Sequence, residues 1–385
     1  MGGLLDIVGQ DEVIARLQRG LEGQRRPHAY LFAGPVGVGK RTTALALAQT
    51  LLCRAGRTQP NKGRLPRLEA DFPLRDACGR CEDCRMVLAG SHPDFILVYK
   101  ELAQYHEDPK VRDRVMQELG IDVIRSFLIA PAGRSPARGE NKVFVVREAD
   151  LLSIAAQNSL LKTLEEPPPG VTIILLCQQA EELLPTTVSR CSLVRFGPLP
   201  RDFIVRRMGE QGIDPARAEF WAGLTGGSLG ESLRLEQQGM YEVKVDLLER
   251  AAALGPAGDS ELGEHLAKTM DKLAQQEIAR AKAEGGSADL SANLAKRRVV
   301  ATMLEILGSA FRDALYLSTG TNLPMVHTDQ RRCIEAIARR LTPTQLAEAI
   351  EQLSQLESLL WRNVNPKAVW DNVVITCASA APLRV

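Results

Sequence analysis

The stretch HAYLFAGPVGVGK at residues 28–40 decides the fold of this chain. Its apolar run (29–33) reads as a strand, and RTTALALAQTLLC (41–53) reads as a helix from its good helix formers and leucine spacing. A strand, a glycine-rich turn and a helix are the context of a phosphate-binding loop. We therefore expect a P-loop in which Lys40 reaches the phosphates of a nucleotide, although a glycine-rich turn that holds nothing is the alternative. Three glycines would allow the turn and its inward backbone N–H groups: Gly34, Gly37 and Gly39.

The residue after the lysine departs from an active P-loop. That position needs a Ser or Thr hydroxyl to place Mg²⁺, and this chain has Arg41. Thr42 and Thr43 follow, but their side chains point about 100° and 200° away around the helix. The loop is therefore predicted to be degenerate: ATP could be held by the backbone and Lys40, without the ion that hydrolysis requires.

Three further apolar runs predict the rest of a parallel sheet. They are DFILVY (94–99), KVFVV (142–146) and VTIILL (171–176), and buried parallel strands have this composition. A helix is expected at 151–166, ended by three prolines at 167–169. Strands that alternate with helices predict an α/β fold with a parallel sheet.

After about residue 197 strand-like runs become rare and helical patterns dominate. The chain is therefore divided into an α/β domain (1–196), a small helical domain (197–240) and a larger helical domain (241–385). The expected helices of the last two are 201–214, 215–224, 228–238, 293–318 and 342–362.

Composition excludes several classes of protein. The chain has 385 residues, with 48 Lys and Arg against 47 Asp and Glu, and this balance argues against a protein that coats DNA by charge. Aromatic residues make up only 4%, which argues against a single-strand binder built on stacking. No apolar run approaches 18 residues, and the start has no basic region typical of a signal peptide, so we expect a cytoplasmic protein with no membrane segment.

Four of the eight cysteines form a predicted metal knuckle: Cys53, Cys78, Cys81 and Cys84. The two-residue spacing of the last three lets their thiolates converge on one ion, and four sulfurs without an open position indicate structural Zn²⁺. Free thiols or an iron–sulfur cluster are the alternatives. Residues 54–77 read as an irregular insertion, and His92 reads as a loop residue rather than a ligand.

Several motifs together resemble one family. QNSLLKTLEEPP (157–168), SRC (189–191) and SHPDF (91–95), downstream of the P-loop and with the four cysteines, resemble the AAA+ subunits of bacterial DNA polymerase III clamp loaders. The resemblance covers about residues 5–240, with a weaker match at 362–374. It implies an AAA+ P-loop domain with a zinc module at about 53–84, then a helical lid domain and a helical collar that packs against other subunits.

Within that family, this chain resembles the non-hydrolysing delta-prime class rather than the gamma and tau ATPases. The ATPases have a hydroxyl at position 41 and an Asp at position 147, where this chain has Arg41 and Arg147. Sensor 1 would fall at Cys177 or Gln178, and Gly230 stands where the sensor 2 arginine is expected.

Two charged residues, Glu148 and Arg190, each allow two interpretations. Glu148 stands where a water-activating Glu would be, but a solvated acid at a strand end is the favoured interpretation. Arg190 of the SRC motif would be an arginine finger that enters a neighbouring subunit's nucleotide site, although alone it reads as an ordinary loop arginine. Lys162, Glu165 and Glu166 would lie on the same face, or be solvated surface charge.

The leading hypothesis is thus a stator-like clamp-loader subunit of the DNA polymerase III holoenzyme. The resemblance implies gamma/tau and delta subunits as partners, and the sliding clamp and primer–template DNA through the complex. An active gamma/tau-type ATPase is the alternative, and a sensor that holds ATP without cleaving it is a third.

Overall fold

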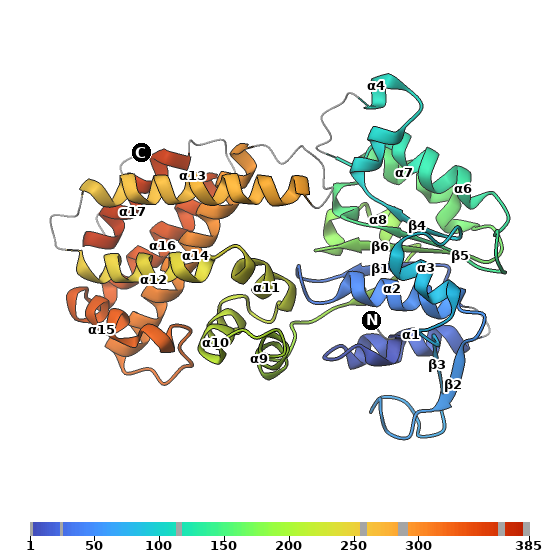
Figure 1. Cartoon of the computed structure of the whole chain (residues 1–385), viewed down its shortest axis with the longest axis horizontal. Coiled ribbons are helices and arrows are strands. Elements are labelled where there is room, and N and C mark those ends of the chain that lie inside the picture. Colours follow the sequence, from blue (N-terminus) through green and yellow to red (C-terminus); the bar gives the residue numbers. More distant parts are fainter. Residues whose placement is uncertain are drawn as a thin grey trace. The chain divides into compact units, whose positions relative to one another are not determined.

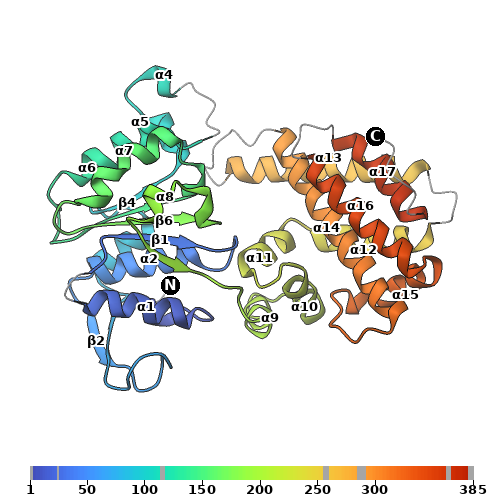
Figure 2. The ribbon, with the colours of Figure 1, turned by 180° about the vertical axis from the view of Figure 1, so that it is seen from behind.

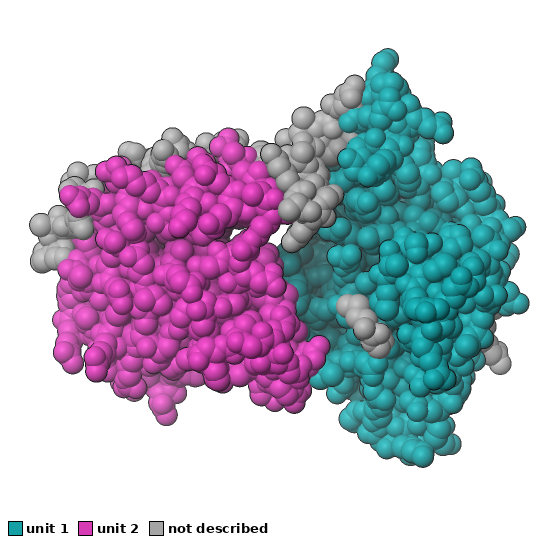
Figure 3. Space-filling view, in the orientation of Figure 1, with its two compact units in different colours: residues 1–200 teal, residues 201–385 magenta. Residues whose placement is uncertain are grey.

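The structure is a computed structural model in two compact units, residues 1–200 and 201–385 (Figure 3). Each unit is described by itself. The residues that the structure describes are 3–23, 26–112, 118–254, 260–283, 292–360 and 366–379. Part of the weaker motif predicted at 362–374 therefore lies outside the described residues.

The first unit is built on a five-stranded parallel sheet with the order β4-β5-β6-β1-β7. The four predicted strands are confirmed, and the fifth, β7, was not anticipated because only four residues form it and half of its side chains are polar. The strands are β1 (Ala29–Ala33), β4 (Phe95–Val98), β5 (Lys142–Val146), β6 (Val171–Cys177) and β7 (Ser192–Arg195).

Helices cover both faces of the sheet, so alternate residues of each strand enter two different cores (Figures 1 and 2). In β1, Tyr30 and Phe32 pack with α1 (Asp11–Glu22) and α2 (Lys40–Leu52), while Leu31 packs on the opposite face. That opposite face is covered by α5 (Ile121–Ile124), η3 (Arg125–Ile129), α6 (Ala130–Ala132) and α7 (Ile154–Glu165). Shorter elements connect these: η1 (Leu4–Asp6), α3 (Glu82–Ala89), η2 (Lys100–Tyr105), α4 (Pro109–Arg112), η4 (Ala149–Leu151), η5 (Ala180–Glu182) and α8 (Pro185–Val188).

The insertion at 54–77 is ordered, so the expectation of an irregular segment was wrong. It forms an antiparallel hairpin of β2 (Arg57–Pro60) and β3 (Pro73–Asp76). The buried Asn61 donates to three backbone carbonyls of the connecting loop, and the buried Gln18 of α1 exchanges two 2.8 Å hydrogen bonds with the backbone of Arg75. Buried amides thus shape the hairpin and fasten it to α1, where composition alone suggested a loop.

The elements in the described part of the second unit are all helices, as predicted. Its longest helix, α14, packs against α12, α13, α15, α16 and α17. The predicted segment 215–224 coincides with α10, 293–318 falls on α14, and 343–360 of the segment predicted at 342–362 falls on α16, while residues 361–362 lie outside the described residues. The helices are α9 (Arg201–Gly209), α10 (Pro215–Leu224), α11 (Leu229–Gln237), α12 (Met240–Ala253), α13 (Ser260–Ala283), α14 (Ala292–Thr319), η6 (Thr328–Gln330), α15 (Arg331–Arg340), α16 (Pro343–Leu360) and α17 (Pro366–Ser379).

A buried ion pair lies at the centre of this unit. Lys244 of α12 is fully buried, and its ammonium donates to Asp329 of η6. It also lies 4.5 Å from the ring centroid of Phe220 and 4.9 Å from that of Tyr241, whose hydroxyl donates to Asp329 at 2.6 Å. Burial opposes ionisation of Asp329, but the hydrogen bonds from Lys244 and Tyr241 outweigh it and lower the pKa of the carboxyl. The pair thereby ties α10, α12 and η6 together.

Replacement of Lys244 by methionine is expected to lower the free energy of unfolding of this unit by about 3–5 kcal/mol, because it leaves the Asp329 carboxylate buried without its cation. Since the pKa of Asp329 is lowered in the folded state, its contribution is full above about pH 4 and is lost as the pH falls through the folded pKa. Denaturant titration at several pH values measures both effects.

The matched control is Glu210→Gln, which breaks the exposed Arg207–Glu210 pair and should change the free energy by less than about 0.5 kcal/mol. A Lys244→Met variant as stable as that control would contradict the role of the pair.

Candidate functional site

The loop between β1 and α2 has the glycine-dependent shape of the predicted P-loop. Gly37 and Gly39 have φ values of 75° and 100°, and Gly39 is the N-cap of α2. A Cβ on Gly34 would lie 2.5 Å from the carbonyl oxygen of Phe196, so only glycine fits beside the end of β7. The Gly34 N–H donates to Gln178, the residue after β6, at 2.9 Å. Three strand ends therefore hold the loop.

The Lys40 side chain folds back and binds backbone carbonyls of the P-loop. Its ammonium donates to the carbonyl of Gly34 and, at 2.6 Å, to that of Pro35. Burial lowers its pKa, while Cys177 and Asp150 act in the opposite direction. These two carbonyls use two of the three N–H donors of the ammonium, so one donor remains for a phosphate oxygen.

Neither threonine supplies the missing hydroxyl. Thr43 is buried, and its hydroxyl donates to the Gly39 carbonyl, four residues earlier, at 3.0 Å, so the first turn of α2 uses this hydroxyl. Thr42 is half-buried on the same first turn of α2. The position directly after Lys40 therefore offers only the Arg41 guanidinium.

Two guanidinium groups share the region where a divalent ion would be seated. Arg41 is exposed at the surface, but partial desolvation lowers its pKa, and the positive charge of Arg147, directly after β5, lowers it further. Arg147 also lies 5.7 Å from the ring centroid of Tyr99. The positive charges of Arg41 and Arg147 oppose the binding of Mg²⁺. Because this ion prefers carboxylate and hydroxyl oxygens, the residues present do not fit it.

Asp150, Glu148 and Cys177 are further titratable groups at or next to the carboxyl ends of β5 and β6. Burial raises the pKa of Asp150, which disfavours its charged form. Glu148 is exposed, in line with a solvated strand-end acid. Cys177 ends β6, and burial raises its pKa to about 12, so its thiol is neutral near pH 7.

The four predicted knuckle cysteines converge. Their sulfur atoms all lie within 4.8 Å of one another, with Cys53 Sγ 3.7 Å from Cys81 Sγ and Cys78 Sγ 4.0 Å from Cys84 Sγ. Tetrahedral coordination with Zn–S bonds of about 2.3 Å puts sulfurs about 3.8 Å apart, so this set fits such an ion. All four are free of disulfides. The cluster can therefore hold a metal ion, with Cys53 included.

Backbone and charged groups build this knuckle. The N–H groups of Cys78, Cys81 and Cys84 each donate to the sulfur of another knuckle cysteine at 3.3–3.4 Å. The hydrogen bonds donated by the backbone N–H groups of Arg80 and Cys81 lower the pKa of Cys78 to about 6, in favour of the thiolate.

Residues next to the knuckle fasten it to the sheet domain. Asp83 is buried and pairs with Arg54 at 3.0 Å and with Arg138 at 3.2 Å. His92 lies 3.6 Å from Asp83, and its Nδ1 accepts the Asp94 N–H at 3.0 Å. His92 is thus a structural loop residue, as predicted. The sequence alone did not reveal this network, because its acids and bases are scattered from 54 to 138.

Arg190 lies in the turn between α8 and β7, next to the end of α7. Its Nε donates to Glu165 Oε1 at 2.6 Å, its Nη2 donates to the same oxygen, and its Nη1 donates to the Thr186 carbonyl at 2.8 Å. Of the two alternatives for Glu165, a place on the same face as Arg190 or solvated surface charge, the structure brings it into an ion pair with Arg190, and its side chain stays partly exposed. Glu166 is exposed and makes no ion pair with a described residue.

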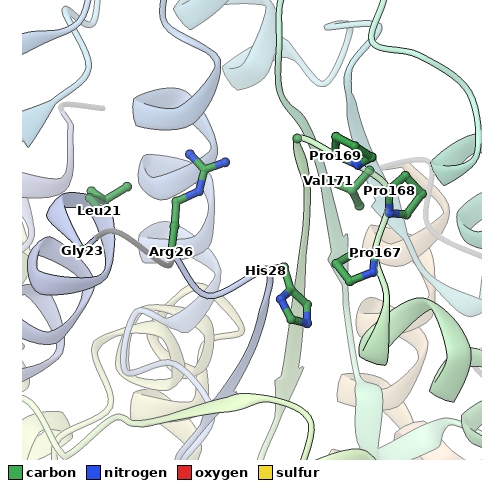
Figure 4. Close-up of a pocket in the computed structure, with 9 residues that line it drawn as sticks. Leu21, Gly23, Arg26, His28, Pro167, Pro168, Pro169 and Val171 are labelled. Carbon is green, nitrogen blue, oxygen red and sulfur yellow. The ribbon is translucent and has the colours of Figure 1, made fainter.

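A cavity of about 360 Å³ opens at the other end of the sheet. Figure 4 shows His28, which precedes β1, facing the proline run after α7. Its Nε2 makes a 2.7 Å hydrogen bond with the Leu164 carbonyl. In open α/β sheets ligands bind at the carboxyl ends of the strands, whereas this cavity lies at the amino end of β1 and so is distinct from the loop site. It is lined by Leu21, Gly23, Arg26, His28, Pro167, Pro168, Pro169, Gly170 and Val171.

Comparison with known proteins identifies the family. A profile described as "DNA polymerase III, delta subunit" matches residues 9–200, and one described as "DNA polymerase III, delta subunit, C terminal" matches residues 269–373. The chain belongs to the DNA polymerase III delta-subunit family. The predicted resemblance is therefore confirmed.

Several relatives of this delta-family chain carry related names. The DNA polymerase III subunit delta' of Bacillus subtilis is 25% identical over 95% of both chains. The subunit delta' of Pseudomonas aeruginosa is 33% identical over 58% of this chain and 60% of its own length. The subunit tau of Escherichia coli is 31% identical over 66% of this chain and 36% of its own length.

Among solved structures, a DNA polymerase III gamma subunit-related protein of Thermotoga maritima aligns over 96% of this chain and 98% of its own, at 15% identity and a TM-score of 0.39. A score this low adds nothing to the fold assignment, which rests on the strand order of the delta-family chain itself. None of its described helices is both long and apolar enough to cross a membrane.

Metal removal is expected to loosen one part of this delta-family chain. Cys81→Ala, or a strong chelator, removes a sulfur ligand or the ion and should raise hydrogen exchange in residues 50–90 while β5 and β6 stay protected. Elemental analysis should find about one metal ion per chain, and none in the variant.

Cys333→Ala is the control, because that cysteine of α15 lies outside the knuckle. Loss of protection throughout the first unit would show that the knuckle does more than fasten residues 50–90.

Proposed function

We propose that this chain is a delta-prime-type, non-hydrolysing subunit of the replicative clamp loader within the DNA polymerase III holoenzyme. The observation that carries the proposal is the pair of guanidinium groups, Arg41 and Arg147, beside an otherwise intact P-loop turn. A divalent cation near them would be repelled by both guanidiniums. Hydrolysis by this chain's own site is therefore disfavoured by electrostatics.

The proposed ligands follow from the same residues. The degenerate loop would hold ATP, if at all, without cleaving it, through the backbone and side chains of the loop. Structural Zn²⁺ would be bound by the four knuckle cysteines, since their separations match a tetrahedral site. The loop residues are Gly34, Gly37, Gly39, Lys40, Arg41 and Thr42.

Its proposed partners come from the names of its relatives, which are subunits of DNA polymerase III. The chain would brace gamma/tau and delta subunits in the cytoplasm and contact the sliding clamp and primer–template DNA through the complex. The three-domain division at 196 and 240 remains part of this proposal, with the last domain as the collar.

Arg190 is the proposed contribution of this chain to ATP hydrolysis. A guanidinium is always charged and can fork onto the oxygens of a transferring phosphoryl group. Its side chain is 30% exposed, so it is open to a partner. A chain whose own loop disfavours Mg²⁺ has no use for such a group at its own site, which favours action on a neighbouring subunit.

An active gamma/tau-type ATPase is the second candidate, favoured only by the relationship to tau. It requires phosphate release by the chain alone. A nucleotide sensor is the third, favoured by the preserved glycine turn. It requires ATP binding without turnover.

Arg190→Ala should lower hydrolysis at the neighbouring site by about 10³-fold in a loader assembled with gamma/tau and delta subunits, because fingers delivered in trans supply effects of this size. Assembly, measured by mass, should be unchanged. Steady-state phosphate release is the assay, with the exposed Arg207→Ala as control.

If a loader that contains the Arg190→Ala variant hydrolysed ATP as fast as the wild-type loader, Arg190 would not be an arginine finger. Phosphate release by the purified wild-type chain, at the rate of the assembled loader, would overturn the non-hydrolysing role itself.

Magnesium should not strengthen any binding of ATP to the isolated chain, because Arg41 and Arg147 repel it. Calorimetric titration with and without Mg²⁺ measures this. The double variant Arg41→Thr with Arg147→Asp restores a hydroxyl and a carboxylate, and in it Mg²⁺ should tighten ATP binding by at least about tenfold. A similar effect in the wild type would contradict the proposed electrostatics.

A further inference from the structure

The contact between Arg190 and Glu165 joins two segments of the first unit that are 25 residues apart. Glu165 Oε1 accepts from both the Nε and the Nη2 of Arg190, so one carboxylate oxygen binds the Nε–Nη2 edge of the guanidinium. Charge-assisted hydrogen bonds of this kind fix direction as well as distance. The Thr186 carbonyl accepts from Nη1 and completes a three-point hold.

This hold leaves part of the guanidinium available. An arginine has five N–H donors. Three are used by Glu165 and Thr186, and the other two have no acceptor among the residues that the structure describes. With the side chain 30% exposed, two donors of a fixed group remain for an acceptor outside the chain.

The end of α7 that carries Glu165 is held by a buried side chain and by a hydrogen bond. Glu165 is the last residue of α7 and follows Leu164, whose side chain is buried and whose carbonyl makes the 2.7 Å hydrogen bond with His28. The proline run begins two residues later and prevents the helix from continuing. The carboxylate is thus attached to a fixed helix end.

The element that carries Arg190 is fastened to the same helix. The buried Gln157 near the start of α7 accepts from the Leu184 N–H at 2.8 Å and from the Thr187 hydroxyl at 3.3 Å. Gln157 therefore holds α8, and Glu165, two turns further along α7, holds the arginine that follows α8. One helix sets both the position of the turn and the direction of its guanidinium.

We propose that Glu165 is a positioning residue for Arg190, an inference that rests on the proposed arginine finger. A free arginine side chain samples many rotamers, and each turnover would have to order it. The Glu165 carboxylate orders it beforehand through the Nε edge and presents the two unused donors to a phosphate oxygen of a nucleotide held by the neighbouring subunit. Transition-state stabilisation depends on donors being aimed before charge develops.

The negative charge of Glu165 should slow hydrolysis at the neighbouring site, whereas its hydrogen bonds to Arg190 should speed it. A carboxylate beside the finger partly neutralises it and repels phosphate, so removal of charge alone would favour hydrolysis. Glu165→Gln keeps an acceptor oxygen and removes the charge, whereas Glu165→Ala removes both. A comparison of the two variants therefore separates the effect of the hydrogen bond to Arg190 from the effect of the negative charge.

The experiment uses the assembled loader and measures kcat and KM for ATP. Glu165→Ala should lower kcat at the neighbouring site by about tenfold with KM within about twofold, because the finger is misdirected rather than absent. Glu165→Gln should stay within about threefold of the wild type. The matched control is Glu166→Ala, an exposed glutamate one residue further along, which should change neither constant.

Each outcome separates this inference from the function on which it rests. If Arg190→Ala keeps full hydrolysis, the finger itself is wrong. If Arg190→Ala abolishes hydrolysis while Glu165→Ala leaves kcat unchanged or raises it, only the positioning role is overturned. In an Arg190→Ala background, Glu165→Ala should cause no additional loss, and a further loss would also overturn it.

A second variant keeps the test decisive if Glu165→Ala does not assemble. Glu165→Asp keeps the charge but withdraws the carboxylate by one methylene, so it should lower kcat by at least about threefold. An Asp variant with the wild-type kcat would contradict the proposed aim.

Discussion

The repulsion between the Arg41 and Arg147 guanidiniums is the constraint on which the rest of the interpretation depends. Both side chains come from the carboxyl-end edge of the sheet, where β5 ends and α2 begins. The charge of Arg147 is one of the forces that lower the pKa of Arg41. A divalent ion would add a third positive centre in the same region. The fold can therefore keep a P-loop while the site is unfit for the ion that the loop ordinarily serves.

The loop survives because the fold itself uses it. Gly34 packs against the Phe196 backbone, and its N–H is bonded to Gln178. The buried Gln10 donates to the carbonyls of Val38 and, at 2.8 Å, Gly197, so the loop also fastens the amino-terminal segment to the end of β7. Loss of these glycines would disturb three strand ends at once. A glycine pattern can thus persist for packing reasons, and its presence alone is weak evidence for turnover.

The sequence predicted the parallel sheet because apolar, β-branched runs such as KVFVV (142–146) have few other uses in a globular chain. It also predicted the four-sulfur cluster, since the knuckle spacing is restrictive and any loop length can bring Cys53 back to it. It missed the hairpin in residues 54–77, because strands of four residues rich in Arg and Pro have no periodic signal. The buried Asn61 that shapes the loop gives no such signal either.

At the candidate finger, too, the deciding contact joins residues that are far apart in the sequence. From sequence, Lys162, Glu165 and Glu166 are three charged residues near the end of one helix, and nothing shows which of the two glutamates meets an arginine. Only the three-dimensional path of the chain brings Arg190 to one of them. In the proposed mechanism the direction of the guanidinium depends on its partner. The role proposed for the SRC motif therefore involves both Arg190 and the end of the helix that carries Glu165.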